Sequence, residues 1–425
     1  MMNELDINSY ELNIIKNVIN KYPEITNLIG EVQFTPRCYG ANSEKKTYGK
    51  MLFKNVDINQ LKEFDRTILS VLLYYYIKDN KYDKFVEQQS VNDRLSKKTF
   101  EKIRSFVLSN FNTVEKENLL LYYVVINDLG KSQKMIDILK HKDIETINHD
   151  LVLNYLLQYN ILPSLNNFSE ENRQNLINIL NNGINLGQFI QGECVDYSFN
   201  KIQNLSSFEK ILMLTESMLD IGGVLGHINN QNGSVILNQS TTDDFITASK
   251  IIFTSVDSTK IFNEFLNQKA DKMQVKIEKR NIRKTITRIC LMMRLNNQND
   301  IKMVEDEILN NLNQYKTLIY EFDQSGYNNL PAILLYYSPS VLNNTYEYFK
   351  KNNSQKPIND TLRYCLPFFQ RIMKTIRMNV NNNENGIITI ILRDAAIVAA
   401  EDPFKLCLFE VNILNKNEAS IFKKC

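Results

Sequence analysis

The sequence predicts an all-α protein, either a multi-helix bundle or an irregular helical array, on three observations. Apolar residues recur at helical spacing along most of the 425 residues. Short polar turns separate these periodic segments, which is typical of helices that pack beside their neighbours in the chain. Apolar residues make up 43% and charged residues 23% of the chain, so it can bury a core.

The N-terminal part combines one expected helix with one irregular segment. Residues 7–21 place their apolar side chains on one helical face and predict a helix. Residues 30–56 carry glycine and proline between two short extended pieces, EVQFTPR and KTYGKMLFK. We therefore expect a small hairpin or an ordered loop there.

From Ile58 onward the pattern is helical almost without interruption. Prolines mostly mark the starts and stops of the segments, because proline lacks the donor that a helix interior needs. The expected helices are 58–78, 92–110, 116–128, 131–140, 146–158, 169–182, 241–252, 257–268, 270–295, 298–312, 327–337, 358–378, 387–400 and 402–415.

The composition shifts at about residue 183, since seven of the 13 glycines lie between Gly183 and Gly233. This span is the expected junction or site-bearing core. We expect three parts: an N-terminal helix with an extended segment at 1–57, a helical domain at 58–182, and a helical domain at 183–425 that carries the candidate site.

The net charge and the cysteine spacing limit which cellular compartment and which binding partners the sequence predicts. The net charge of +2 gives no general reason to expect nucleic acid or an anionic membrane. No cysteine forms a C-x-x-C pair, no zinc spacing is present, and no segment resembles a secretory signal or a membrane-spanning run. We expect a cytoplasmic protein with reduced thiols, no membrane association, and a partner, if any, that is another protein.

The candidate site lies on the stretch Phe208 to Asn230, FEKILMLTESMLDIGGVLGHINN. At 100° per residue, Glu209, Glu216, Asp220 and His227 fall within about 40° of one another. Apolar side chains surround this narrow stripe, which predicts a buried helix. The stripe stays aligned only if the helix continues through Gly222-Gly223, which is costly for a helix interior.

Two charged carboxylates four residues apart repel each other, so Glu216 and Asp220 need a cation or a shared proton. With His227 they form a candidate catalytic and metal-binding set, which would take a divalent metal as cofactor or act as an acid–base pair. Glu193 is a further candidate ligand. The competing interpretation is a structural polar core, in which Arg288 or Arg294 pairs with the carboxylates.

Three functions follow from these patterns, and the sequence does not decide between them. The first is an enzyme or small-molecule binder with a carboxylate and histidine cavity. The second is a helical protein-interaction protein. The third is a nucleic-acid-associated protein acting through residues 269–288, where Lys272, Lys276, Lys279 and Arg283 would share one helical face. That segment has no aromatic residues for base stacking, so nucleic acid is the weaker expectation.

Overall fold

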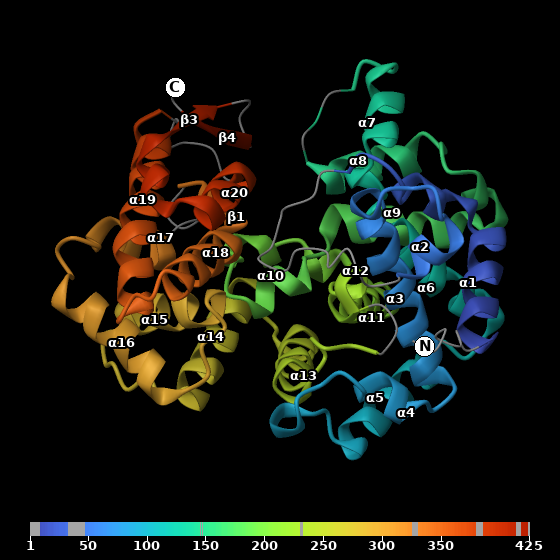
Figure 1. Cartoon of the computed structure of the whole chain (residues 1–425), viewed down its shortest axis with the longest axis horizontal. Coiled ribbons are helices and arrows are strands. Elements are labelled where there is room, and N and C mark those ends of the chain that lie inside the picture. The colour runs from blue at the N-terminus through green and yellow to red at the C-terminus, as the bar shows by residue number, and fades with distance from the viewer. Residues whose placement is uncertain are drawn as a thin grey trace, which may run out of the picture. The chain divides into compact units, whose positions relative to one another are not determined.

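The structure is a computed structural model and confirms the all-α prediction, since helices dominate the chain (Figure 1). It describes residues 9–32, 47–144, 146, 148–229, 233–324, 330–379, 386–413 and 418–423. These fall into two compact units. Unit 1 contains the described residues of 1–34, 40–183 and 204–246; unit 2 contains those of 184–203 and 247–425. Whether the segments 1–57, 58–182 and 183–425 fold independently stays a prediction.

Unit 1 is helical throughout. Its α-helices are α1 (Ser9–Lys21), α2 (Tyr48–Leu52), α3 (Lys62–Lys78), α4 (Tyr82–Val86), α5 (Lys97–Asn110), α6 (Val114–Ile126), α7 (Gln133–Lys140), α8 (His149–Gln158), α9 (Glu170–Asn182), α11 (Ser207–Gly223) and α12 (Gly226–Asn229). Its 3₁₀ turns are η1 (Pro23–Leu28), η2 (Ile58–Leu61), η3 (Val91–Asp93), η4 (Leu129–Lys131) and η5 (Pro163–Asn167).

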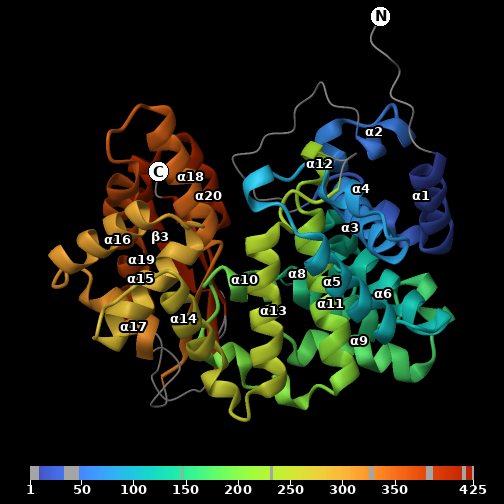
Figure 2. The ribbon, with the colours of Figure 1, turned by 90° about the horizontal axis from the view of Figure 1, so that it is seen from below.

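The core of unit 1 forms where α3 and α11 pack against each other, with α6 beside them (Figure 2). Helix α3 is apolar on nearly every side, from Phe64 through Ile77, and thirteen of its side chains are buried. A helix that is apolar all round belongs in the interior. Helix α11 is buried in the same way, as its sequence pattern indicates.

By length and composition alone, the stretch Ser207–Ile228 would also be able to cross a membrane, contrary to the expectation that no segment reaches that length. Of its most apolar window, 67% is buried inside the fold. A core helix of a soluble protein meets the same criterion, so this stretch is weak evidence for a membrane.

In unit 2, helices surround a small β-sheet. Its elements are α10 (Leu186–Ile190), η6 (Asp196–Phe199), η8 (Ser258–Lys260), α14 (Ile261–Lys272), α15 (Arg280–Met292), α16 (Gln298–Asn310), α17 (Lys316–Gln324), α18 (Ser338–Lys351), α19 (Pro357–Asn379), α20 (Arg393–Glu401) and η9 (Pro403–Leu408). Two elements, η7 (Ile202–Asn204) and α13 (Gln239–Thr254), begin in one unit and end in the other.

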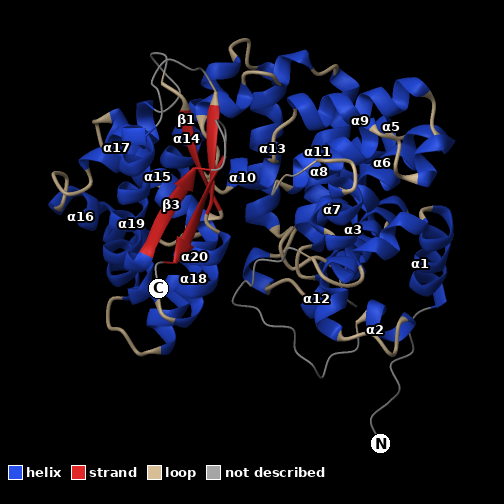
Figure 3. Ribbon diagram, turned by 90° about the horizontal axis from the view of Figure 1, so that it is seen from above, coloured by secondary structure: helices blue, strands red, loops and turns tan. Residues whose placement is uncertain are grey.

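The sheet of unit 2 has the strand order β1-β2-β4-β3 (Figure 3). Its strands are β1 (Ala332–Tyr336), β2 (Ile387–Ile391), β3 (Phe409–Ile413) and β4 (Glu418–Lys423). Strand β2 pairs in parallel with β1 and β4, and β3 pairs antiparallel with β4. Helices α18 and α19 connect β1 to β2, and α18 packs on both α19 and α20.

Three helices expected in this part of the chain are therefore wrong in whole or in part. Residues 332–336 of the expected helix 327–337 form β1, the expected helix 387–400 begins with β2, and the expected helix 402–415 is η9 followed by β3. Parallel strands covered by helices read as continuous apolar runs. Periodicity alone does not separate such a run from a buried helix segment.

The expected helix 270–295, which would carry the basic stripe, is also wrong, because α14 ends at Lys272 and α15 begins at Arg280. Arg283 turns back onto this loop, where its Nε donates to the Val275 carbonyl at 3.0 Å and its guanidinium pairs with Asp271. The four basic residues therefore do not share one helical face.

The expected N-terminal hairpin falls mostly on residues 33–46, which lie outside the described residues. Of the described remainder, Val32 forms an isolated bridge with Ser132, and Tyr48–Leu52 forms α2 instead of an extended piece. The Thr47 hydroxyl accepts a hydrogen bond from the Lys50 amide and caps this short helix.

Candidate functional site

Helix α11 starts with a capping box. The Ser206 hydroxyl accepts from the Glu209 amide at 3.2 Å, and the Glu209 carboxylate accepts from the Ser206 amide at 2.6 Å. The other Glu209 oxygen accepts from Asn178 on α9 at 2.9 Å. Both oxygens of this buried glutamate therefore have partners, and helix capping accounts for it.

Glycines let α11 and α12 approach α3 closely. A Cβ on Gly223 would lie 2.0 Å from the Ser70 hydroxyl, and one on Gly226 would lie 2.4 Å from the Asp65 carbonyl. Helix α11 ends at Gly223, and the chain turns before α12 starts at Gly226. His227 is buried and lies on this short helix.

Where α11 meets α3, the structure holds four charged side chains, which we call the charge quartet: Glu63 and Arg66 of α3, and Asp128 and Lys131 around η4. Arg66 lies 2.5 Å from one Glu63 oxygen, and Lys131 lies 3.2 Å from the other. Lys131 also contacts Asp128 at 2.6 Å. The two acids and the two bases thus form ion pairs with one another beneath the surface of unit 1.

The acids of the charge quartet titrate as a pair. Burial raises the pKa of Glu63, and the Asp128 carboxylate beside it adds to this effect. Burial also opposes the charge on Asp128, but the Lys131 and Arg66 cations and a hydrogen bond from Glu63 hold the pKa of Asp128 well below its ordinary value. Glu63 therefore holds a proton more readily than Asp128.

Glu216 stands next to this quartet but is not paired within it. The side chain is 2% exposed, and burial followed by the charge of Asp220 raises the pKa of Glu216 well above its ordinary value. Its Oε2 accepts a long hydrogen bond of 3.4 Å from Ser217, while Oε1 has no hydrogen-bond partner. Burial and the neighbouring carboxylate thus favour the protonated form of Glu216.

Asp220 and Tyr123 complete the surroundings of Glu216. Asp220, one turn further along α11, raises the pKa of Arg66, together with the closer charges of Glu63 and Asp128. Burial, followed by the neighbouring carboxyls of Glu216, Asp150 and Asp220, raises the pKa of Tyr123 on α6, which keeps its phenol neutral. The charge on Arg66 therefore interacts with that of Asp220, one of the two carboxylates for which the sequence suggested Arg288 or Arg294 as a partner.

The other sequence candidates lie in unit 2. Arg288 is buried, and its guanidinium donates to the backbone carbonyls of Gly192, Glu193, Cys194 and Phe322. Burial lowers the pKa of Arg288 to about 10. Arg294 is exposed, and its guanidinium reaches the Gln191 side chain at 3.4 Å.

Glu193 has a defined structural role in unit 2. Its carboxylate accepts the backbone amide of Tyr337 at 2.5 Å. Tyr337 links β1 to α18 with a φ of +74°, a left-handed conformation that is uncommon for tyrosine. Glu193 therefore fixes a strained turn and is accounted for without a metal.

Within the described part of the chain, no group of three or more His, Cys, Asp or Glu side chains is arranged to hold a metal ion. Glu216, Asp220 and His227 are included in that search. What this site offers chemically is a buried carboxyl with a raised pKa next to a set of paired charges. Proton donation suits such a carboxyl, because it keeps its proton to a higher pH than an exposed carboxyl does.

Four residues of this site are not among those that the sequence pattern singles out: Glu63, Arg66, Asp128 and Lys131. A usable signal was present: each acid precedes a base by three residues, and each pair borders a continuous apolar run. A charged side chain that close to a core segment is often buried, and a buried charge needs a partner of opposite charge.

No curated protein and no solved structure matches the chain. Residues 20–406 match the family DUF6829, described as a family of unknown function. Because this match spans well over half of the sequence, the chain belongs to the family DUF6829.

Proposed function

We propose that unit 1 is an enzyme or small-molecule binder that uses Glu216 as a proton donor toward a small polar ligand. The observation that carries this proposal is the Glu216 carboxyl, which is buried, has a raised pKa, and has no hydrogen-bond partner at Oε1. A buried acceptor without a partner costs about 1–3 kcal/mol. Acids with such perturbed pKa values gather at functional sites.

Two glutamates on the same helix make the contrast clear. Glu209 is buried at the start of α11, and both of its oxygens are engaged by the capping box and Asn178. Glu216 is equally buried two turns later but has one long hydrogen bond from Ser217. Helix capping accounts for the burial of Glu209, whereas the hydrogen bond from Ser217 leaves Oε1 of Glu216 without a partner.

The charge quartet supports the proposal, because its acids and bases pair with one another and leave Glu216 available to a ligand. Lys131 and Arg66 both contact Glu63, and Lys131 also contacts Asp128. Neither cation forms an ion pair with Glu216, and the raised pKa of Glu216 favours its protonated form. A protonated carboxyl can give its proton to an acceptor or donate a hydrogen bond to it.

Glu216 is closed off in this structure, so a ligand reaches it only when neighbouring elements move. The nearest break in the helices is the turn between Gly223, where α11 ends, and Gly226.

Of the described cysteines, Cys194, Cys290 and Cys365 are buried free thiols and Cys407 is an exposed one. Free thiols support the proposal that the protein works in the reducing cytoplasm.

The test is a ligand screen of the full chain by thermal shift, with small polar molecules grouped by charge. Wild type is compared with Glu216→Gln, which keeps the shape but cannot donate an acidic proton. Glu209→Gln is the matched control, since it alters a buried glutamate of the same helix whose role is capping.

We expect at least one compound class to raise the Tm of wild type and of Glu209→Gln but not of Glu216→Gln. The proposal is wrong if no class stabilises wild type, or if every stabilising class acts equally on Glu216→Gln. In that case Glu216 is a polar residue of the core.

A further inference from the structure

The charges around Glu216 limit the kind of ligand that it can take. The charges that act most strongly on Glu216 are those of Asp220, Asp128 and Asp150, and all three are acids. Asp220 lies one turn further along α11, Asp128 lies at the start of η4, and Asp150 lies in the first turn of α8. The Glu216 carboxyl is thus exposed to negative charge from three elements of unit 1.

The acids and bases of this region do not balance. Beside the two acids and two bases of the charge quartet stand two more carboxyls, Glu216 and Asp220, which interact electrostatically with the quartet. Four acids and two bases leave two carboxyls in excess. Asp150 adds little to this excess, because its side chain is 50% exposed and lies 3.3 Å from the ring of His149. The cluster is therefore neutral only when two of its carboxyls hold a proton or meet a further cation.

Glu63 and Glu216 are the two carboxyls that supply this balance, but they differ in their partners. Burial raises the pKa of both and favours the protonated forms. Each oxygen of Glu63 lies beside a cation, Arg66 at 2.5 Å and Lys131 at 3.2 Å. Oε1 of Glu216 is buried and has no hydrogen-bond partner. Of the two, Glu216 is therefore the carboxyl that a ligand would complete.

A monovalent organic cation fits this setting. It can replace the Glu216 proton and leave the charge of the cluster unchanged, whereas an anion would add to the excess of negative charge. An ammonium group also supplies hydrogen-bond donors, and a donor is what Oε1 lacks. One turn from Glu216 on α11, the side chains of Leu212, Met213 and Leu219 are buried and apolar, which suits a short carbon chain on the nitrogen.

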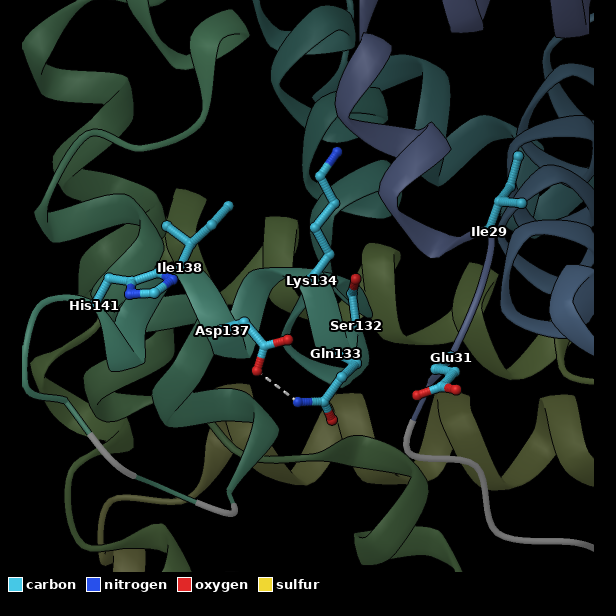
Figure 4. Close-up of a pocket in the computed structure, with 8 residues that line it drawn as sticks. All are labelled: Ile29, Glu31, Ser132, Gln133, Lys134, Asp137, Ile138 and His141. Atoms are coloured by element: carbon cyan, nitrogen blue, oxygen red, sulfur yellow. Dashed lines mark hydrogen bonds between the residues drawn. The ribbon is translucent and has the colours of Figure 1, made fainter.

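The charge quartet lies near the surface of unit 1. The side chains of Arg66 and Lys131 are 12% and 13% exposed. Ser132, which follows Lys131 in the chain, lines a surface hollow of about 390 Å³ (Figure 4). Glu216 is 2% exposed, so a small molecule from this side reaches it only when the side chains of the quartet move.

We propose that the ligand of Glu216 is a small primary amine, which takes the Glu216 proton and is held as an ammonium ion at Oε1. This inference rests on the proposed function, because it names the class of ligand that Glu216 serves. In this step the O–H bond of the carboxyl breaks and an N–H bond forms, which gives a carboxylate and an ammonium ion. Because an alkylamine is already protonated in water at neutral pH, the complete exchange releases one proton to solvent for each amine bound.

The test is ligand-observed saturation-transfer NMR on the full chain at pH 5, 6 and 7. The probes are n-propylamine, its anionic counterpart propanoate and its neutral counterpart 1-propanol. Wild type is compared with Glu216→Gln, and Glu209→Gln is the matched control from the same helix. The titratable and charged groups around Glu216 on α3, α6, α8, α11 and η4 are the same in all three proteins: Glu63, Arg66, Tyr123, Asp128, Lys131, His149, Asp150 and Asp220.

We expect n-propylamine to bind wild type and Glu209→Gln, with an affinity that rises up to about tenfold per pH unit because one proton is released. In Glu216→Gln the binding should be about tenfold weaker at pH 7, and its rise with pH should be lost. Undiminished binding in Glu216→Gln, or an affinity in wild type that does not change with pH, would overturn the inference. Displacement of the amine by an equal concentration of potassium ions would also overturn it, since the site would then take inorganic cations.

The two counterpart probes separate this inference from the proposed function. Binding of propanoate or 1-propanol that Glu216→Gln removes would overturn the amine as the ligand class and leave the proposed function standing. If wild type binds none of the three probes, the inference is wrong. The proposed function fails as well only if the wider ligand screen finds no class that depends on Glu216.

Discussion

The exchange Glu216→Gln isolates the proton on Glu216. In the folded protein, burial and the charge of Asp220 raise the pKa of Glu216 well above 4.5, its ordinary value. In the unfolded chain the carboxyl returns to that ordinary value. Between the two pKa values the folded state holds a proton that the unfolded state releases, so the free energy of unfolding falls as the pH rises. Glutamine has no such proton, and the variant loses this dependence.

The size of the effect follows from linkage. Each pH unit above 4.5 costs the wild type about 1.4 kcal/mol relative to Glu216→Gln, for as long as Glu216 stays protonated in the fold. With the proton kept up to pH 7, the difference there is about 3 kcal/mol. For a unit of this size, about 3 kcal/mol corresponds to roughly 6–12 °C in Tm.

Differential scanning calorimetry of both proteins at pH 5, 6 and 7 measures this difference. Other groups with raised pKa values, such as Asp65 at about 7, are present in both proteins and cancel. Glu209→Gln is expected to have the opposite sign, with a loss of about 1 kcal/mol, because it weakens the capping box. The reasoning is refuted if the Tm difference between wild type and Glu216→Gln does not grow with pH.

Three further changes test other parts of the structure. Gly223→Ala places a Cβ 2.0 Å from the Ser70 hydroxyl and should cost about 1–3 kcal/mol in urea unfolding; an unchanged midpoint would disprove the close approach of α11 and α3. Lys131→Met removes a cation from the charge quartet and should cost about 3–5 kcal/mol, part of which the double variant with Asp128→Leu should recover; additive losses would contradict the network. Glu193→Ala leaves the Tyr337 amide without its acceptor and should lower stability by about 1–3 kcal/mol, with faster amide hydrogen exchange at Tyr337 as the diagnostic readout.

Helical periodicity was enough to predict the fold class and most elements of unit 1. Ser169 caps α9 as its sequence indicates, since its hydroxyl accepts from the Asn172 amide at 3.3 Å. The strands escaped prediction because β1 and β2 are five-residue apolar runs, too short to show a period of their own. Pro367 lies inside α19, where the flanking helix is long and apolar enough to retain it.

The candidate site could be predicted only in part. Glu216 and Asp220 were identifiable because they stand four residues apart on an apolar helix. The cations whose charges interact with Asp220, Arg66 and Lys131, are more than 80 residues away in sequence, and no local pattern links them. His227 follows on α12, beyond the end of α11 at Gly223, and its place in the candidate set stays a prediction.

The proton on Glu216 at neutral pH is the central claim, and carboxyl NMR measures it most directly. In protein labelled with ¹³C at the glutamate side-chain carboxyl, the Glu216 resonance is the one missing from the Glu216→Gln spectrum. The account predicts that this resonance has the chemical shift of a protonated acid at pH 7 and moves only at higher pH. A Glu216 resonance at the ionised position at pH 7 would contradict it.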